Sequence, residues 1–385
     1  LKVRASFGLV GSDETGLAAG APHYLYLSDV NMYGGGQFHS GYDGSFTKNG
    51  PIINSYPVQD AHWERASEFD LGVDMRFFDQ LNITVDWFKN KRDRILMRRA
   101  SFPSVLGYQN AIPWANVGKV DNTGLELSLN WTKTFQRDWT IDARFNYSYS
   151  RNKYVYVDEP DYPYIWQTRT GKPLSSTYGY VAEGLFRDEA EIKASPDQSL
   201  FGSTIMPGDI KYRDINGDGS ITSEDQIMLS PYGNMPRIQY GFGLSMQWKN
   251  LDLSVFFNGS AKRTIMISGV SPFCANDSND NNLMQWIADS HWSEGADNTG
   301  VLYPRLGTLT TQVTNNTQPS SFWMRNGNFL RFKTLELGYR FKWFRLYFSA
   351  NNVAVWSKFK YWDPELSFNS YPLQRTFNIG LQFNL

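Results

Sequence analysis

The chain has 385 residues, with 37 Lys and Arg against 38 Asp and Glu, four histidines and one cysteine. Its balanced charge disfavours a general nucleic-acid binder, which carries a basic excess. A lone cysteine, Cys274, excludes an internal disulfide framework, and the scattered histidines contain no HxH or HExxH pair, so a zinc hydrolase has little support. No run approaches the roughly 18 apolar residues that a membrane-spanning helix needs.

Aromatic residues make up 16% of the chain, which is high for a soluble protein and suits the aromatic girdles of a membrane interface. Leu1 begins directly in a strand-like run, with no initiating Met and no signal peptide before it. We therefore expect the chain to be a piece of a longer protein.

Apolar and polar residues alternate with a period of two in ten segments, as in β-strands with two different faces. These segments span residues 1–9, 69–77, 81–87, 125–131, 141–149, 240–248, 251–257, 335–341, 346–350 and 377–385. Alternation alone fits both a barrel in lipid and a soluble sandwich, because each has one apolar and one polar face.

The connections between the segments separate these two folds. Short turns near Asp79-Gln80, 134–137, Lys249-Asn250 and Lys342-Trp343 alternate strictly with long excursions. Outer-membrane barrels have this asymmetry, with short periplasmic turns and long extracellular loops. The long loops cover roughly residues 11–65, 98–115, 154–236, 263–327 and 354–374. The sequence therefore predicts an all-β, transmembrane, antiparallel up-and-down barrel.

Aromatic residues cluster beside the short turns, where they would form a periplasmic girdle. They are Phe77, Phe78, Trp131, Trp139, Trp248, Trp343 and Phe344. Ten strands in lipid would leave two unpaired edges, which is very costly. We expect the barrel to be completed by strands that this chain does not contain.

Six stretches, in order along the whole chain, resemble the SusC-like branch of the TonB-dependent outer-membrane transporters. The Asp-rich segment Pro207-Gly-Asp-Ile-Lys-Tyr-Arg-Asp-Ile-Asn-Gly-Asp-Gly219 is the most diagnostic. The others are Asn116 to Glu126, Gly171-Lys-Pro-Leu with Tyr178-Gly-Tyr180 and Gly184-Leu-Phe186, Trp292 with Tyr303-Pro-Arg305, Asn328-Phe-Leu-Arg331 through Tyr339, and Asn351-Asn352 with Tyr361-Trp-Asp-Pro-Glu365.

This resemblance implies TonB-dependent active import of oligosaccharides or peptides across the Gram-negative outer membrane, and no enzymatic activity. Residues 1–385 would then form the C-terminal ten or so strands of a plugged barrel of about 22 strands. The N-terminal strands, the plug and the segment that contacts TonB would lie outside this chain. The implied partners are a SusD-like surface lipoprotein, TonB, the imported ligand and outer-membrane lipid, with no nucleic acid.

Two alternatives remain open. A siderophore- or vitamin-type TonB-dependent receptor would share the barrel, but would lack the lipoprotein lid and the Asp-rich insertion. A secreted β-rich glycan-binding module or glycan hydrolase belongs to a different class. It would need a compact core or a catalytic carboxylate pair, and no such pair is identifiable by spacing. Nothing in the sequence distinguishes a glycan cargo from a peptide cargo.

The segment Asp214 to Asp225 fits a calcium-loop template, with oxygen ligands at alternating positions and a glycine at the sharp turn. The expected ligands are the side chains of Asp214, Asn216, Asp218 and Asp225 and the backbone carbonyl of Ser220. Thr222 or a water molecule would fill the remaining position, and Ile221 would anchor the loop. The alternatives are a metal-free turn, or a dockerin module, which needs a second loop that the sequence lacks.

Aromatic residues in the long loops are candidates for ligand contacts, because their faces stack on sugar rings and on peptide side chains. We single out Tyr162, Tyr164, Trp166 and Trp323. Packing of one loop on another is an equal alternative for each. Leu283, Trp286 and Ile287 have helical spacing and predict a short packing helix.

Overall fold

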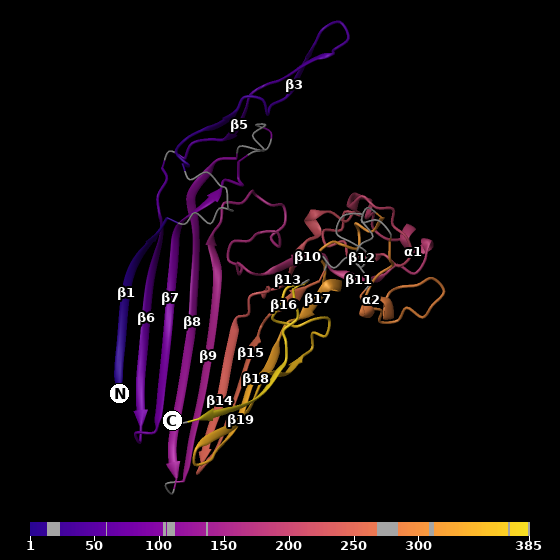
Figure 1. Ribbon diagram of the computed structural model, residues 1–385. Helices are drawn as coiled ribbons and strands as arrows, with labels where there is room; N and C mark the ends of the chain where they lie inside the picture. The colour runs from indigo at the N-terminus through magenta and orange to yellow at the C-terminus, as the bar shows by residue number, and fades with distance from the viewer. Residues whose placement is uncertain are drawn as a thin grey trace.

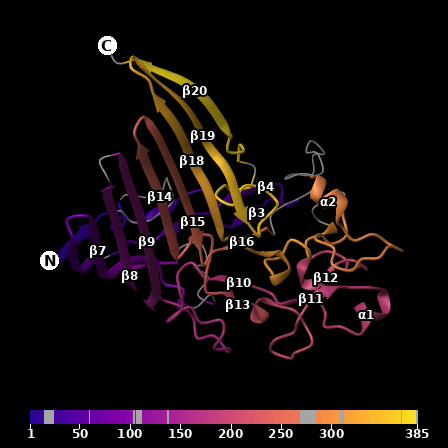
Figure 2. The same cartoon turned by 90° about the horizontal axis from the view of Figure 1, so that it is seen from below.

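The computed structural model describes residues 1–13, 24–58, 60–102, 105, 112–135, 138–267, 284–307, 312–368 and 370–383. One sheet of ten strands dominates them, with its strands in chain order and all neighbours antiparallel. The sheet is a curved, open wall (Figures 1 and 2). Its strands are β1 (Lys2–Ser12), β6 (Glu64–Phe77), β7 (Leu81–Arg98), β8 (Trp114–Phe135), β9 (Trp139–Tyr156), β14 (Ile238–Trp248), β15 (Leu251–Ala261), β18 (Phe329–Arg340), β19 (Phe344–Ser357) and β20 (Thr376–Phe383).

Within the described residues, all ten predicted strands and the up-and-down order are confirmed; positions 384–385 of the last predicted segment lie outside them. The connections also follow the prediction, because the short turns lie at the lower end of the wall in Figure 1 and the long loops at the upper end. Lys249, for example, takes a positive φ of 50° and joins β14 to β15 in a two-residue turn, with Trp248 opposite Leu251. Part of the turn predicted at 134–137 lies outside the described residues.

The two faces of the wall differ as the alternation predicts. On the outward face, Val85, Leu127 and Tyr147 lie side by side across β7, β8 and β9. One residue along each strand, Asp86 and Glu126 occupy the opposite, inner face. This separation of apolar and polar side chains repeats along the wall because successive residues of a strand point to opposite faces.

Aromatic rings gather at the turn end of the wall, as predicted. Trp139 stacks on Trp248 with ring centroids 5.2 Å apart, and Phe341 stacks on Phe344 at 4.7 Å. Further up the inner face, the Phe88 ring covers Gly124, where an added Cβ would lie 2.4 Å from the ring. A glycine is needed there because the added Cβ would also lie 2.5 Å from the backbone oxygen of Tyr149.

The long loops after β9, β15 and β19 fold together at the upper end of the wall into a second body, which we call the outer lobe (157–237, 262–267, 284–307, 312–328 and 358–368). Its elements are β10 (Thr177–Gly179), β11 (Ala182–Leu185), α1 (Glu189–Lys193), a 3-10 turn (Ser199–Phe201), β12 (Ile210–Tyr212), a 3-10 turn (Ser223–Asp225), β13 (Ile227–Ser230), β16 (Thr264–Met266), α2 (Gln285–Asp289), a 3-10 turn (Ser321–Trp323) and β17 (Met324–Asn326).

The outer lobe has its own buried core. It contains Tyr180, Ile210, Tyr212, Ile221, Ile265, Ile267, Ile287, Tyr303, Trp323 and Phe359. The predicted packing helix is confirmed as α2, with Ile287 fully buried; Leu283 lies outside the described residues. Among the described residues, no helix has the length and apolar character needed to cross a membrane.

The loop between β1 and β6 forms a separate arm that rises above β1–β9 in Figure 1. It consists of two short strand pairs, β2 (Asp29–Asn31) with β5 (Ile52–Ser55), and β3 (Gln37–Ser40) with β4 (Phe46–Asn49). Several large side chains of the arm are exposed: Tyr24, Tyr26, Met32, Tyr33, Phe38, Tyr42 and Phe46.

Candidate functional site

The inner face of the wall carries charged clusters at two places. Arg4 reaches from β1 across β6 to β7, with its guanidinium 2.9 Å from Asp74 and 2.8 Å from Asp86. Thr84 adds a hydrogen bond to Asp74 at 3.1 Å. These contacts cross three adjacent strands, so they fix the register of the wall while keeping its inner face polar.

A second cluster lies in the C-terminal half of the wall. The Arg345 guanidinium contacts Glu336 at 2.6 Å and also pairs with Asp252. An arginine fork suits two carboxylates at once, because its planar N–H groups point in fixed directions. Both clusters are only partly exposed, and no catalytic arrangement of a nucleophile and a base is formed by them.

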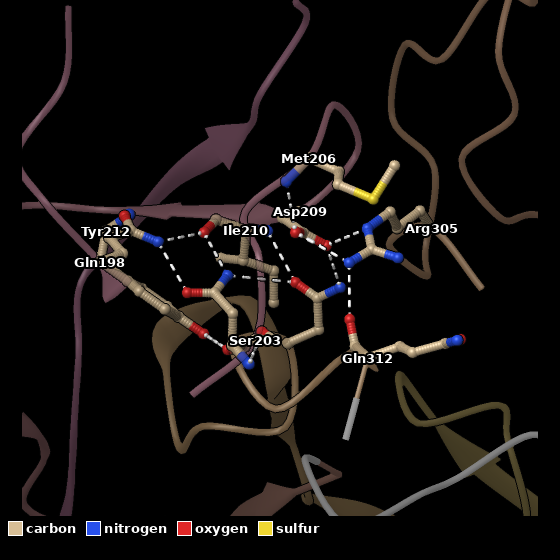
Figure 3. Close-up of polar contacts among 10 residues, drawn as sticks. Gln198, Ser203, Met206, Asp209, Ile210, Tyr212, Arg305 and Gln312 are labelled. Atoms are coloured by element: carbon tan, nitrogen blue, oxygen red, sulfur yellow. Dashed lines mark hydrogen bonds and ion pairs between the residues drawn. The ribbon is translucent and has the colours of Figure 1, made fainter. Parts of the chain in front are cut away.

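The outer lobe is held by a buried ion pair, drawn in Figure 3. Asp209 is fully buried, and its carboxylate lies 2.6 Å from Arg305 Nε. It also accepts hydrogen bonds from the Met206 amide at 2.9 Å and from Asn316 Nδ2 at 2.7 Å. Burial raises the pKa of Asp209, while the guanidinium and the amides oppose that shift. Full pairing is what makes such a buried carboxylate tolerable.

Three amide side chains next to this pair form the hydrogen bonds that a neighbouring strand would otherwise form (Figure 3). β12 pairs with β11 on one edge, and its other edge is satisfied by Gln198, Asn315 and Asn316. The Ile210 amide donates to Asn316 Oδ1 at 2.8 Å, and the Tyr212 amide donates to Gln198 Oε1 at 2.8 Å. Buried backbone groups need partners, and these side chains supply them.

The Tyr212 side chain completes the same network. Its hydroxyl donates to the Asn315 carbonyl at 2.7 Å. Burial raises the pKa of Tyr212, so the phenol stays neutral and remains a donor. The polar network therefore joins residues from two loops that lie far apart in the sequence.

Several of the motifs that carry the family resemblance contact one another here. Pro207-Gly-Asp209 and Tyr303-Pro-Arg305 form one ion pair, and the Arg305 amide donates to the Gly208 carbonyl at 3.0 Å. Arg331 forms a second pair, with Asp363 and Glu365 each 2.6 Å away. In both cases an arginine from one loop or strand end binds a carboxylate from another.

The Asp-rich segment folds into a closed loop. Asp214 accepts hydrogen bonds from the amides of Gly217 and Gly219, at 2.6 and 2.8 Å. Gly217 and Gly219 have positive φ values of 79° and 87°, a conformation that favours glycine. Ile221 is fully buried in the lobe core, so its predicted anchoring role is confirmed.

The proposed calcium ligands fit the loop in part. Asp214, Asn216 and Asp218 lie along one turn, and Asn216 Nδ2 is 2.9 Å from Asp218 Oδ2. Asp225 is fully buried, and its two oxygens accept from the amides of Ile215, Asn216 and Thr222. The Ser220 amide donates to Asp218 Oδ1 at 2.8 Å. In the described part of the chain, no three acidic, His or Cys side chains converge as a metal site. Calcium therefore stays a prediction.

The predicted ligand-contacting aromatics have different environments. Tyr164 stacks on Trp166 at 4.6 Å, and Trp166 Nε1 donates to the Glu224 carbonyl of the Asp-rich loop at 2.7 Å. Tyr162 is 39% exposed. Trp323 is 1% exposed, and its Nε1 donates to the Asn316 carbonyl. Its assignment as a ligand contact is wrong, because the ring fills the lobe core and has no free face.

Sequence reasoning missed Asp209, Gln198, Asn315 and Asn316 as the residues that organise the lobe. Asp209 and Arg305 belong to motifs that were recognised, but nothing in either motif indicates that they pair. The amides gave no signal, because Asn and Gln in a long loop are usually solvated.

Comparisons with known proteins agree with this architecture. The family described as "TonB dependent receptor-like, beta-barrel" matches residues 19–353. TonB-dependent receptor P3 of Formosa agariphila is 26% identical over 376 residues, covering 86% of this chain and 35% of the relative. TonB-dependent receptor SusC of Bacteroides thetaiotaomicron is 24% identical, covering 99% of this chain and 37% of the relative. The chain thus spans about a third of these relatives.

A solved structure, the RagAB peptide importer in its "open-open" state, shares the fold. Its TM-score is 0.65 at 21% identity, over 100% of this chain and 40% of the importer chain. Members of the matched family are outer-membrane transporters and not enzymes, so the apolar outward face of the wall is its lipid-facing side. The chain, which resembles SusC in sequence and the RagAB importer in fold, belongs to the TonB-dependent receptor β-barrel family.

Proposed function

We propose that the full-length protein imports oligosaccharides or peptides across the outer membrane, driven by TonB. The observation that carries this proposal is a barrel wall with a polar inner face beneath a folded outer lobe. In the described residues, β1 and β20 each have one edge without a partner strand. Residues outside this chain would supply the closing strands, a plug inside the barrel and the segment that contacts TonB.

A SusD-like surface lipoprotein is the proposed partner at the outer end. The β3–β4 ribbon is amphipathic, with Phe38, Phe46 and Lys48 on one face and His39 and Thr47 on the other. An isolated two-stranded ribbon is marginally stable in water. A partner that covers Phe38 and Phe46 would stabilise the arm, since both rings are more than half exposed.

Tyr162, Tyr164 and Trp166 are the proposed cargo contacts. Trp166 is anchored to the Asp-rich loop through its indole N–H, and this contact orients the stacked ring of Tyr164. Tyr162 presents an exposed ring nearby in the same segment. Rigid aromatic faces of this kind stack on sugar rings or on peptide side chains at a low cost in conformational entropy.

The first test is purification of the full-length protein from native outer membranes in mild detergent, with mass spectrometry of what co-elutes. A stoichiometric surface lipoprotein is expected, and Phe38→Ser/Phe46→Ser should reduce its recovery. Phe78→Ser is the matched control, because Phe78 is 89% exposed but lies at the turn end of the wall.

The second test measures uptake of labelled oligosaccharide and oligopeptide pools by a deletion strain with and without the complementing gene. Uptake should require both the gene and TonB, and Tyr162→Ala should reduce it more than it reduces protein level. Restored growth on chelated iron without uptake of either pool would instead identify a siderophore-type receptor.

We also propose that the Asp-rich loop binds calcium, which would stiffen a long extracellular loop and take no part in chemistry. The support is the oxygen-rich sequence and the preformed turn at Asp214, Asn216 and Asp218. Calcium should raise the melting temperature of chelator-treated protein, and Asp218→Ala should abolish that rise. If metal analysis finds no bound divalent ion, or if Asp218→Ala melts like the native protein in calcium, the loop is a metal-free turn.

A further inference from the structure

The outward face of the wall changes character near the upper ends of β7, β8 and β9. A row of large apolar side chains, Trp87, Leu125 and Tyr149, crosses these strands as cross-strand neighbours. Two residues further up each strand, at a rise of about 3.3 Å per residue, the same face becomes charged. The apolar band therefore ends abruptly on this part of the wall.

The next two rows hold four cations and one carboxylate. Lys89, Thr123 and Arg151 form the first row, and Lys91, Asp121 and Lys153 form the second. Lys119 follows on β8, above Asp121. We call Lys89, Lys91, Lys119, Arg151 and Lys153 the cationic patch; all five residues are exposed.

Within the described part of the chain, none of these five cations forms an ion pair. The nearby carboxylate of Asp93 is engaged by Arg65 at 2.8 Å and lies 4.0 Å from Arg94. Asp121 alone stands between the lysines of the second row. A net positive charge thus lies directly above the lipid-facing apolar row.

An open hollow of about 490 Å³ lies at the upper edge of the cationic patch. Its lining includes Arg65, Arg94 and Lys119, together with Asp93 and Tyr156. Arg94 has a positive φ of 59° at a break in the β7–β8 register, and Asn116 Nδ2 donates to its carbonyl at 2.8 Å. The backbone irregularity that borders this hollow is therefore held in place by a hydrogen bond.

The other half of the wall has no matching patch among its described residues. There the outward face stays apolar toward the loops, where Phe257 stacks on Phe332 at 4.5 Å and lies 6.5 Å from Trp356. Charge at the upper rim is therefore a local property of β7–β9 and not a general feature of the barrel end.

We propose that the cationic patch binds the phosphorylated headgroup of a lipid in the outer leaflet. The acyl chains would lie against Trp87, Leu125 and Tyr149, and the headgroup phosphates would lie against the lysines and Arg151. Cations of alternate strands are about 10 Å apart, since neighbouring strands are separated by about 4.8 Å, so two phosphates on one headgroup can be held together. Basic side chains next to a lipid-facing surface bind anionic headgroups in this way.

The test uses full-length protein in detergent with three probes: a bis-phosphorylated lipid A, the same lipid without phosphates, and inorganic phosphate. The variant Lys89→Gln/Lys91→Gln/Lys153→Gln should bind the phosphorylated lipid about a hundredfold more weakly, because each lysine contributes roughly a fivefold factor. Binding by the native protein should also weaken as salt is raised.

The matched control is Lys133→Gln/Lys249→Gln/Lys342→Gln, which removes three lysines at the turn end of the wall, of which Lys249 and Lys342 are exposed and Lys133 is partly exposed. Control protein should bind the lipid like the native protein, and both variants should show the heat-dependent gel shift of a folded barrel. Equal affinity of the native protein for the dephosphorylated lipid, or full competition by inorganic phosphate at the lipid's concentration, would overturn the proposal. Unchanged lipid binding by the Lys89→Gln/Lys91→Gln/Lys153→Gln variant would also overturn it. A protein cross-linked at Lys89 or Lys91 in native membranes would overturn it as well.

Discussion

The barrel wall and the outer lobe place the same kinds of side chain in opposite positions. In the wall, Leu337 and Trp248 are more than 40% exposed on the outward face, and polar residues line the inside. In the lobe, Trp323 and Ile210 are buried, while charged residues such as Arg187 and Asp297 are exposed. The chain is continuous through both bodies, so the solvent on each side decides which arrangement is stable: lipid around the wall, water around the lobe.

The two bodies also differ in what holds them together. The wall depends on long backbone ladders, such as the pairing of β8 with β9 from Lys119 to Phe135. In the lobe the strands have only three or four residues, and side chains complete their hydrogen bonding. Backbone ladders tolerate side-chain changes, whereas a side-chain network does not. Point substitutions should therefore destabilise one body without destabilising the other.

Trp323→Ala should have the largest effect and should act on the lobe alone. Removal of a buried tryptophan costs about 3–5 kcal/mol, and here the indole hydrogen bond to Asn316 is also lost. Amide hydrogen exchange should accelerate in β11 and β12 and stay unchanged in β8 and β9. Trp343→Ala is the control, since Trp343 is 69% exposed. Equal acceleration in the wall would show that the two bodies unfold together.

Leu127→Lys should act on the wall alone. A lysine on the lipid face near the middle of a barrel strand costs about 2–4 kcal/mol. Ser128→Lys places the same charge on the neighbouring, inner-facing position and should cost far less. Denaturant unfolding of the barrel from lipid vesicles measures both. If the two variants unfold at the same midpoint, the assignment of the two faces is wrong.

Asp209→Asn should loosen the lobe by a smaller amount. The change keeps the shape of the side chain but leaves the buried Arg305 without its countercharge, and hydrogen bonds to a charged group contribute about 1.5–3 kcal/mol. Protease cleavage within 284–307 should become faster. Asp297→Asn, in an exposed turn of the lobe, should leave cleavage at the native rate.

Alkaline pH should produce the smallest difference in stability between the wall and the lobe. Burial raises the pKa of Tyr212 and of Tyr303 above the ordinary value for tyrosine. Both phenols stay neutral in the folded lobe, whereas in the unfolded chain they ionise near pH 10. The lobe should therefore keep its full stability below about pH 10. It should lose up to about 1.4 kcal/mol per pH unit for each tyrosine above that. Tyr212→Phe should reduce this loss in hydrogen exchange of the lobe.

The wall could be predicted from the sequence because its pattern is local. Each strand from β6 to β9 carries its own alternation, and each short turn follows directly from it. The lobe could not be predicted in detail. The second edge of β12 is hydrogen-bonded by Gln198, Asn315 and Asn316, which lie up to 106 residues from it in the sequence. The error at Trp323 has the same origin: Ser321-Phe-Trp323 forms a 3-10 turn with no alternation to show which ring is buried.

The Asp-rich loop could be predicted in part, less fully than the wall and more fully than the rest of the lobe. Its spacing correctly predicted that Ile221 is buried, because the position of an anchor within a twelve-residue loop is a local property. The contact of the Glu224 carbonyl with Trp166 spans 58 residues and has no sequence signal. The sequence predicts only a long loop over roughly residues 11–65, and it gives no sign of the strand pairs there because each strand has only three or four residues.

The lobe core has a consequence for the order of folding. It joins Tyr180, Ile265, Trp323 and Phe359, which come from three different loops, and the Ala182 amide reaches Ser321 Oγ across 139 residues. Such distant contacts form slowly, because large loops must close before any contact is made. The three loops are anchored at their ends by β9, β14, β15, β18, β19 and β20, so pairing of these strands brings the loops together. We therefore expect the lobe to complete its core after these strands have paired, and its loops to become resistant to proteases only at that stage.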